Sequence, residues 1–337
     1  MEAWLYDTMQ DRRVQCRLCS HRCVIGNGKR GICGVRKNRD GVLETQVYGR
    51  LVVAGDDPIE KKPIFHMMPG SRSFSIATVG CNFKCLFCQN ADISQMPADR
   101  DGMVAGDPAT PRQVVSAARQ RGCAGIAYTY TEPTVFFEFA CDTAQLAHRR
   151  GIKNVFVTNG FMSAEALERI SPWLDAANVD LKAFTDDFYK RRCGARLEPV
   201  KETLRRMKGL GIWVEVTTLI IPGLNDDPAE LSRLAAFIAD DLGPETPWHV
   251  SRFHPTYRLT DRGSTPVETL MQARKIGISA GLKYVYTGNI PGRGGEDTIC
   301  PGCGETVIAR GGFQIMDNRV RKGRCSGCGA VIDGIDL

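Results

Sequence analysis

Short, almost entirely apolar runs recur along the middle of the chain, and polar loops and amphipathic segments separate them. The runs lie at residues 74–79, 125–130, 154–158, 178–181, 212–221, 248–253 and 282–286. Strands buried on both faces of a parallel sheet have this apolar character. Alternation of such strands with helices predicts an α/β fold, a partial (β/α)6-type barrel or an open version of one, over residues 74–287.

Three of the separating segments begin with a helix-start signal. Thr110, Asp227 and Thr265 are each followed by a proline and, at the third helical position, by Glu or Gln. The first residue can cap the helix, and proline suits its first position. We therefore expect these three residues to be N-caps. In such folds the reactive groups follow the carboxyl ends of the strands, so the loops after each run are the place to look for chemistry.

The segments on either side of this region have a different character, which predicts three parts. Residues 1–73 form a cysteine-rich, metal-binding N-terminal module with a lead-in, and residues 288–337 form a glycine-rich linker with a small cysteine-rich domain. The net charge is +6, and residues 1–40 hold nine Lys and Arg against four acidic residues. No aromatic residues are interleaved with these charges as a reader of single-stranded nucleic acid would need, so nucleic acid is not an expected partner.

Composition favours an ordinary globular enzyme, with 43% hydrophobic and 24% charged residues. No apolar stretch reaches the ~18 residues of a membrane span. The first ten residues carry Glu2 and Asp7 and lack the basic start and apolar run of a signal peptide. We therefore expect a cytoplasmic protein with no membrane association.

Eleven of the fourteen cysteines fall into three groups, which indicates metal binding in a chain without a signal peptide. The groups are Cys16, Cys19, Cys23 and Cys33; Cys81, Cys85 and Cys88; and Cys300, Cys303, Cys325 and Cys328. The other three cysteines, Cys123, Cys141 and Cys193, are interpreted as small buried hydrophobic residues.

The central group has the spacing Cys-x3-Cys-x2-Cys and directly follows the first predicted strand. Three thiolates on one short loop can each bind one iron of a [4Fe–4S] cluster, which leaves the fourth iron without a protein ligand. Structural zinc needs four ligands, and His66 precedes the strand and so lies at its other end. Zinc or unligated thiols are the alternative at this loop.

This cysteine loop after a first strand resembles the signature of the radical SAM superfamily. The resemblance implies a [4Fe–4S] cluster whose open iron binds S-adenosylmethionine (SAM). It also implies reductive cleavage of SAM to methionine and a 5′-deoxyadenosyl radical that abstracts hydrogen from a substrate. A reductant such as ferredoxin or flavodoxin would supply the electron.

The same resemblance assigns roles to residues after the strands. Phe87 matches the aromatic residue that touches the adenine, and the segment with Glu132 matches the Gly-Gly-Glu that receives the SAM amino group, although Tyr130 and Thr131 replace the glycines. The implied SAM-binding residues are Phe87, Thr129, Thr131, Glu132, Thr158, Asn159, Asp180 and Lys182. The implied catalytic residues are Cys81, Cys85, Cys88, Asp180, Lys182 and His254.

A narrower resemblance extends over nearly the whole chain. The N-terminal cysteines, Asp57–Pro63, Pro69-Gly70, Gln89-Asn90 and Tyr130–Pro133 resemble the AmmeMemoRadiSam-system radical SAM enzymes, relatives of the pyruvate formate-lyase activating enzymes. This implies an oxidoreductase that acts on a protein, by glycyl-radical-type activation, or on a small molecule. It also makes Memo-like and Ammecr-like proteins candidate partners.

The outer cysteine groups each have four members and need no external ligand. Cys300, Cys303, Cys325 and Cys328 form two Cys-x2-Cys-Gly knuckles, which predict a zinc ribbon, with rubredoxin-like iron as the alternative. Cys16, Cys19, Cys23 and Cys33 can hold zinc or an auxiliary iron–sulfur cluster, or can be unligated, and His21 is a possible substitute ligand.

Two other functions compete with the radical enzyme. A metal-stapled zinc-ribbon protein with a non-catalytic cluster would bind nucleic acid or a partner, and it would need a basic face with aromatic readers. An electron carrier would supply four cysteines to its cluster, whereas the central loop has three.

Overall fold

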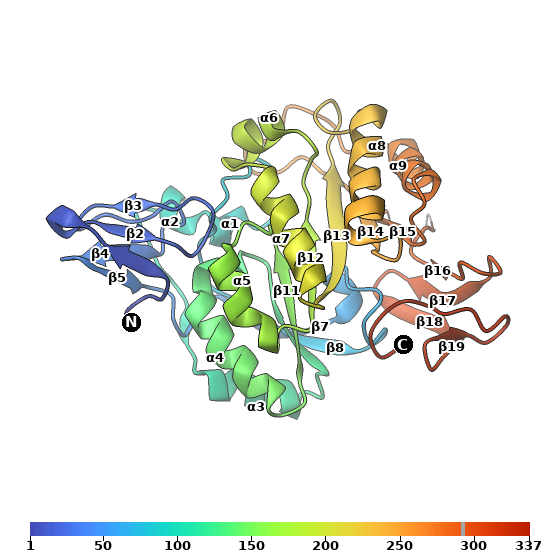
Figure 1. The fold of residues 1–337 in the computed structure, drawn as a ribbon, viewed down its shortest axis with the longest axis horizontal. Coiled ribbons are helices and arrows are strands. Elements are labelled where there is room, and N and C mark those ends of the chain that lie inside the picture. The colour runs from blue at the N-terminus through green and yellow to red at the C-terminus, as the bar shows by residue number, and fades with distance from the viewer. Residues whose placement is uncertain (291–293) are drawn as a thin grey trace.

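An eight-stranded sheet forms the centre of the computed structural model, which describes residues 1–290 and 294–337 (Figure 1). The strand order is β15-β14-β13-β12-β11-β10-β8-β7. Its strands are β7 (Val53–Pro58), β8 (Arg72–Ala77), β10 (Gly125–Tyr128), β11 (Lys153–Thr158), β12 (Ala176–Asp180), β13 (Trp213–Ile220), β14 (Trp248–Arg252) and β15 (Val285–Gly288). Strands β8 to β15 run parallel and β7 is antiparallel to β8. The prediction of a mostly parallel α/β sheet is confirmed, because each predicted apolar run overlaps one parallel strand.

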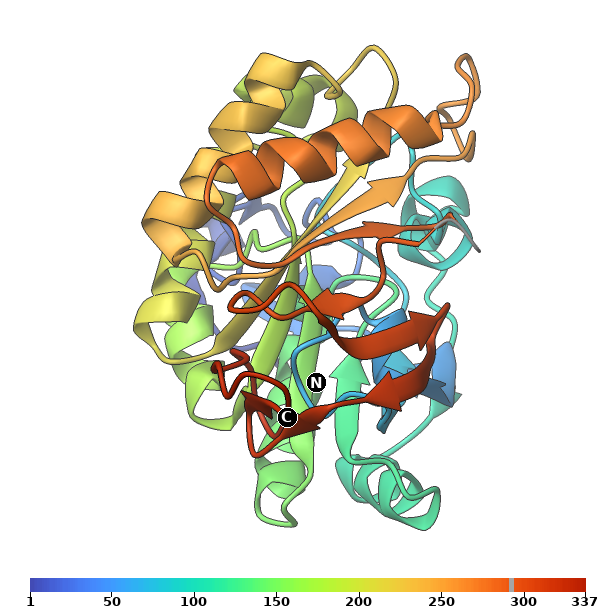
Figure 2. The same ribbon diagram turned by 90° about the vertical axis from the view of Figure 1, so that its right-hand side faces the viewer.

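Helices connect consecutive parallel strands and cover the outer face of the sheet (Figure 2). They are α3 (Pro111–Gln120), α4 (Phe137–His148), α5 (Ala164–Ile170), α7 (Glu198–Gly209), α8 (Pro228–Phe237) and α9 (Val267–Ser279). Shorter helical segments are η1 (Gln10–Arg12), η2 (Ile59–Lys61), α1 (Ala91–Ser94), α2 (Met96–Asp99), η3 (Pro133–Phe136), η4 (Ser171–Trp173), α6 (Asp186–Phe188), η5 (Tyr189–Cys193) and η6 (Ile238–Leu242). The part of the chain that the structure describes has no helix long and apolar enough to span a membrane.

Two of the three predicted helix caps are confirmed. The Thr110 hydroxyl accepts the Gln113 N–H at 3.3 Å, and Asp227 accepts the N–H of the third residue of α8 at 2.8 Å. The third prediction is wrong, since α9 begins two residues after Thr265. The Thr265 hydroxyl instead donates to the carbonyl of Ile220 at 2.5 Å, so a tertiary contact takes the group that would have capped the helix.

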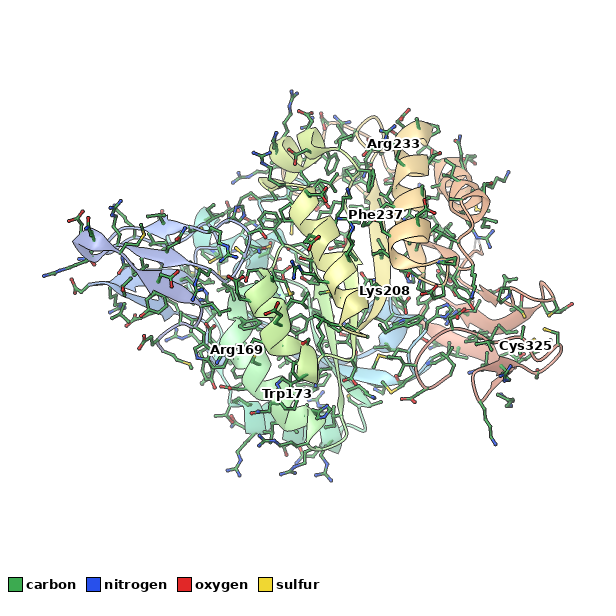
Figure 3. The ribbon with its side chains drawn as sticks, in the orientation of Figure 1. Arg169, Trp173, Lys208, Arg233, Phe237 and Cys325 are labelled. Atoms are coloured by element: carbon green, nitrogen blue, oxygen red, sulfur yellow. The ribbon has the colours of Figure 1, made fainter. Side chains whose placement is uncertain are left out.

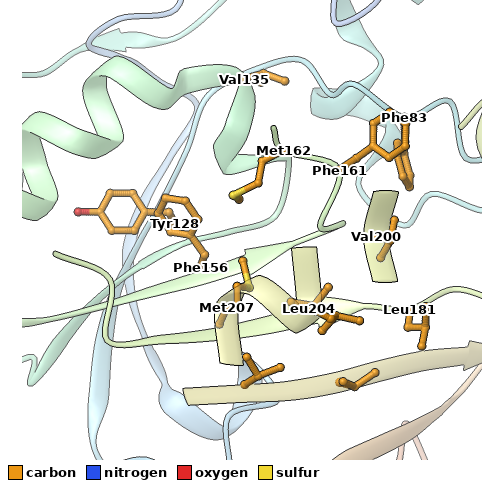
Figure 4. Packing of buried hydrophobic residues seen from close by; sticks show 14 of the residues in the cluster. Phe83, Tyr128, Val135, Phe156, Phe161, Met162, Leu181, Val200, Leu204 and Met207 are labelled. Atoms are coloured by element: carbon orange, nitrogen blue, oxygen red, sulfur yellow. The ribbon is translucent and has the colours of Figure 1, made fainter. Parts of the chain in front are cut away.

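The main core lies between the sheet and its helices and contains large aromatic side chains (Figure 4). Tyr128 on β10 and Phe156 on β11 pack edge to face, with ring centroids 5.2 Å apart. The Tyr128 hydroxyl donates to Asn154 at 3.0 Å, which satisfies its only polar group inside the core. Leu204 and Met207 bring the inner face of α7 into the same cluster.

The N-terminal module packs on the helix α5 side of the sheet (Figure 3). It consists of β1 (Tyr6–Thr8), β2 (Val14–Cys16) and β3 (Val24–Ile25) and the hairpin of β4 (Arg36–Arg39) and β5 (Val42–Thr45). The Ser20 N–H donates to the Phe161 carbonyl at 3.0 Å, in the loop after β11. The Arg169 guanidinium lies 3.9 Å from the centre of the Trp4 ring. This module is therefore fixed to the loops at the carboxyl edge of the sheet.

The C-terminal module lies at the opposite end of the molecule (Figure 1). Its strands are β16 (Thr298–Ile299), β17 (Thr306–Gly311), β18 (Gln314–Asn318), β19 (Val320–Arg321) and β20 (Arg324–Cys325), and a further pair, β6 (Arg50–Leu51) and β9 (Asp107–Pro108), lies near the main sheet. The buried Arg310 stacks on the Phe65 ring at 4.3 Å and donates to the Phe65 carbonyl at 2.9 Å. Residues 291–293 of the predicted linker lie outside the described residues, and the predicted boundary at residue 74 falls inside β8.

Candidate active site

The central cysteine loop follows β8 at the carboxyl edge of the parallel sheet, where the loops after β10, β11 and β12 also meet. Among the described residues, the sulfur atoms of Cys81, Cys85 and Cys88 do not all approach within 4.8 Å of one another, as ligands of one ion would. This wider spacing suits thiolates that bind separate irons of one cluster. The donor set therefore fits a [4Fe–4S] cluster better than a single metal ion.

Burial and neighbouring donors define the chemistry of these thiols. Burial raises the pKa of Cys81 and of Cys88, so without a metal both thiols stay protonated at neutral pH. Iron supplies the positive charge that lets them ionise. The Phe83 N–H lies 3.4 Å from the Cys81 sulfur and the Ser94 hydroxyl 3.2 Å from the Cys88 sulfur, and hydrogen bonds to cluster sulfurs tune its reduction potential.

Cys193 lies beside this loop, although sequence reasoning interpreted it as a small buried hydrophobic residue. It is fully buried, and a hydrogen bond with its thiol, together with burial, raises the pKa of Cys85. Its carbonyl also accepts the Lys84 N–H at 2.7 Å. Nothing in the sequence could place it here, because the π-helical turn η5 brings it back to a loop more than 100 residues earlier.

Glu132 organises the two loops after β10 and β11. Its buried carboxylate accepts the Thr134 N–H at 3.0 Å, the Thr158 hydroxyl at 2.8 Å and the Asn159 N–H at 2.8 Å. Burial raises the pKa of Glu132, and the donors partly offset that effect. Its role in this structure is therefore to position the Thr158–Asn159 loop, a role that the sequence did not assign.

Asn159 connects that loop to the cysteines. Its side-chain amide donates to Asn82 Oδ1 at 2.8 Å and lies 3.7 Å from the Cys81 sulfur. Asn82 was not among the predicted site residues, although its position next to Cys81 was a signal. The two threonines nearby have supporting contacts: the Thr131 hydroxyl donates to the Thr78 carbonyl at 2.9 Å, and the Thr129 N–H donates to the Ile76 carbonyl at 3.1 Å.

Tyr130 keeps the backbone conformation of the glycine it replaces in the resembled motif. Its φ of 64° lies in the left-handed region, which is strained for an aromatic residue. The Asn90 side chain donates to its carbonyl at 2.9 Å, and its hydroxyl donates to Asp57 at 2.7 Å. Contacts at both ends of the residue therefore hold the strained conformation beside the cysteine loop.

Asp180 and Lys182 form an ion pair after β12, with Lys182 Nζ 3.0 Å from Asp180 Oδ2. Burial by itself lowers the pKa of Lys182, but Asp180, Cys85 and Cys193 outweigh it and raise that pKa. The ammonium lies 5.8 Å from the centre of the buried Phe87 ring. A permanent positive charge therefore lies beside the Cys85 thiol and the aromatic ring.

His254 is placed differently from the other predicted residues. It is exposed, and its Nδ1 lies 2.9 Å from the Ser264 hydroxyl. Its loop reaches the cysteine loop through another residue, since the Arg258 N–H donates to the Leu86 carbonyl at 2.9 Å. The described contacts do not join His254 to the cysteines.

The C-terminal cysteines form a compact candidate metal site in the module labelled by Cys325 in Figure 3. The sulfur atoms of Cys300, Cys303, Cys325 and Cys328 all lie within 4.8 Å of one another. The Cys300–Cys328 and Cys303–Cys325 sulfur distances are 3.6 and 3.9 Å. Tetrahedral Zn–S bonds of about 2.3 Å place sulfurs roughly 3.8 Å apart, so one four-coordinate ion fits.

Comparison with known proteins places this site in a family. The model of the Radical SAM superfamily matches residues 75–235. The uncharacterized protein MJ0808 of Methanocaldococcus jannaschii is 48% identical over 334 residues, 98% of each chain. The pyruvate formate-lyase 1-activating enzyme of Escherichia coli K12 is 24% identical over 177 residues, 51% of this chain and 70% of that one.

A solved structure supports the fold alone. Streptococcus suis SuiB bound to S-adenosylmethionine superposes with a TM-score of 0.51 at 12% identity, over 68% of this chain and 52% of that one. The matched segment, residues 75–235, contains the cysteine loop and the ends of β10, β11 and β12. Members of this family bind a [4Fe–4S] cluster and SAM, and the three-thiolate loop described above fits that pair. The chain belongs to the radical SAM superfamily.

Proposed function

We propose that this protein is a radical SAM enzyme of the class of the pyruvate formate-lyase activating enzymes. The observation that carries the proposal is the loop of Cys81, Cys85 and Cys88, which offers three buried or half-buried thiols to a cluster that needs four ligands. When bound, the reduced cluster and SAM supply a 5′-deoxyadenosyl radical that can remove a hydrogen atom from a substrate.

The chain's own residues bind and orient the two cofactors. The three thiolates leave one iron for the amino and carboxylate groups of SAM. The strained backbone at Tyr130 offers polar groups next to that iron, and Glu132 and Asn159 fix the neighbouring loop. Phe87, Asp180 and Lys182 form an aromatic and charged wall suited to the adenosine and methionine parts of SAM.

A protein is the substrate class that the relatives favour. The Escherichia coli relative is named for activation of pyruvate formate-lyase, a protein. By analogy, the hydrogen donor of this enzyme is a glycine Cα–H of a partner protein, with a small molecule as the alternative. Memo-like and Ammecr-like proteins are the partners to test first, and a ferredoxin or flavodoxin in the cytoplasm is the proposed reductant.

The division of the chain follows from this function. Residues 74–287 carry the radical chemistry, residues 1–73 form a metal-binding module at its carboxyl edge, and residues 288–337 form a zinc ribbon. The tight sulfur cluster of Cys300, Cys303, Cys325 and Cys328 supports zinc there.

The experiment that tests the function is SAM cleavage by the reconstituted protein. After anaerobic reconstitution and reduction with dithionite, 5′-deoxyadenosine is quantified by mass spectrometry. The wild type and a Cys123→Ser control should form it, whereas Cys85→Ala should not. If the wild type leaves SAM intact although its cluster is filled and reduced, the proposal is wrong. Deuterium transfer from labelled candidate proteins then identifies the hydrogen donor.

A further inference from the structure

The N-terminal cysteines surround a single cavity between the N-terminal module and the main sheet. Its empty space, part of which is open to solvent, is about 340 Å³. All four thiols line it, and the opposite wall is made by Asn82, Thr134 and Val135 from the loops at the carboxyl edge of the sheet. The cysteine-lined members are Cys16, Cys19, Cys23 and Cys33. The cavity thus brings all four cysteines of this group together around one space.

The distances between these sulfurs differ from those at the C-terminal knuckles. In residues 1–290 and 294–337, the C-terminal four are the group whose sulfurs all lie within 4.8 Å, and the N-terminal four are not so close. The central loop shares the wider arrangement of the N-terminal group. Ligands of one zinc ion lie roughly 3.8 Å apart, whereas thiolates on separate corners of a cluster lie farther apart. The sulfur spacing therefore favours a cluster over a single ion.

Two buried donors in the cavity wall have no partner among the described residues. They are Nε of Arg36 and Nδ2 of Asn82, and both side chains are 1% exposed. An unpaired buried N–H costs about 1–3 kcal/mol, so such groups normally face an acceptor. Thiolate and sulfide sulfurs of an iron–sulfur cluster are acceptors of this kind, and the cluster's negative charge suits the Arg36 guanidinium.

Histidine ligation is excluded at one of the two ring nitrogens. His21 Nε2 lies 2.8 Å from the carbonyl oxygen of Asn82, which can only accept, so this nitrogen carries the proton and donates. The four thiols are thus the natural complete ligand set, and they leave no open iron.

We propose that Cys16, Cys19, Cys23 and Cys33 bind a second [4Fe–4S] cluster, which lies next to the SAM-binding cysteine loop across Asn82. Full ligation by the chain suits this cluster to hold an electron and leaves no iron free to bind substrate. The assignment does not depend on the proposed function, because it can be tested in protein that lacks the SAM-binding cysteines.

The deciding experiment uses the full-length variant Cys81→Ala/Cys85→Ala/Cys88→Ala, purified anaerobically from iron-replete cells. We expect about four irons and four sulfides per chain and, after dithionite reduction, the electron paramagnetic resonance (EPR) signal of a [4Fe–4S]⁺ cluster. Adding Cys19→Ser to this variant should remove the iron while the metal of the C-terminal module is retained. A triple variant with about two zinc ions and no iron, or with a two-iron cluster, would overturn the assignment.

A second measurement covers the case in which the triple variant does not fold. The reconstituted wild type should contain about eight irons per chain, and Cys19→Ser about four. The matched control Cys123→Ser, at a cysteine outside the three groups, should keep about eight. About four irons in the wild type, unchanged by Cys19→Ser, would refute the second cluster.

Discussion

Asn159 Nδ2 donates a hydrogen bond to Asn82 Oδ1 at 2.8 Å, and both side chains are buried. This contact joins the loop after β11 to the loop that carries Cys81. Asn82 also borders the N-terminal cavity, so one short hydrogen-bonded link lies between two groups of cysteines. Changes at this link should therefore affect cofactor chemistry more than folding.

Asn159→Ala is predicted to lower the rate of SAM cleavage about 10- to 100-fold, the usual effect of losing a group that supports metal ligands. The Cys81 sulfur loses a neighbouring N–H, and Asn82 loses its donor. The measurement is 5′-deoxyadenosine formation together with iron content. Thr203→Val, which removes a hydroxyl on α7 away from the cysteines, serves as control. A variant as active as the wild type would exclude this role.

Arg36→Met is predicted to destabilise the fold by about 3–5 kcal/mol, because it leaves the Glu138 carboxylate buried without its partner. The two side chains are each 1% exposed and lie 2.5 Å apart. The double variant Arg36→Met/Glu138→Leu should regain most of the loss. Denaturant unfolding measures both, and a single variant within about 0.5 kcal/mol of wild type would contradict the prediction.

His66 makes stability depend on pH. Burial lowers the pKa of His66 to about 4, and its Nδ1 donates to the Asp333 carbonyl, a contact with the C-terminal module. The unfolded chain, with a histidine pKa of about 6.5, binds more protons between those values, so stability is full above pH ~6.5 and falls as the pH falls toward 4.

The expected loss from His66 is about 2 kcal/mol between pH 7 and pH 5. His66→Gln keeps a donor and an acceptor but does not titrate, so the difference between the two proteins isolates this histidine from all other groups. Denaturant unfolding at both pH values is the measurement. Equal pH dependence in wild type and variant would show that His66 is not responsible.

The C-terminal knuckles should hold one metal ion per chain, and Cys325→Ser should remove it. The Cys328 and Gly327 N–H groups lower the pKa of Cys325 to about 7, which favours its thiolate. Elemental analysis should find about one zinc per chain, absent in the variant. Loss of the ion should open the module to protease while residues of the main sheet stay protected. Zinc retained in the variant would contradict this assignment.

The sequence was most informative where function and fold depend on local spacing. The seven apolar runs predicted the parallel strands because both faces of those strands are buried, and the three cysteines near β8 predicted the site because one short loop holds them. Contacts between distant segments were beyond reach. Cys193 meets Cys85 only through the turn at residues 189–193, and Thr265 leaves its capping role for the Ile220 carbonyl.

Two further features needed three-dimensional distances. The spacing of Cys16, Cys19, Cys23 and Cys33 suited zinc and iron–sulfur equally, and only the cavity and the sulfur separations favour a cluster. Tyr130 departs from the glycine of the resembled motif, and only its backbone φ shows that the left-handed conformation is kept.

The most direct test of the central claim is whether SAM binds the iron that Cys81, Cys85 and Cys88 leave open. The dithionite-reduced protein is mixed with SAM carrying a ¹⁵N-labelled amino group, and electron–nuclear double resonance is recorded. We predict a ¹⁵N coupling in the wild type and none in Cys81→Ala/Cys85→Ala/Cys88→Ala. A wild-type cluster whose spectrum is the same with and without SAM would contradict the account.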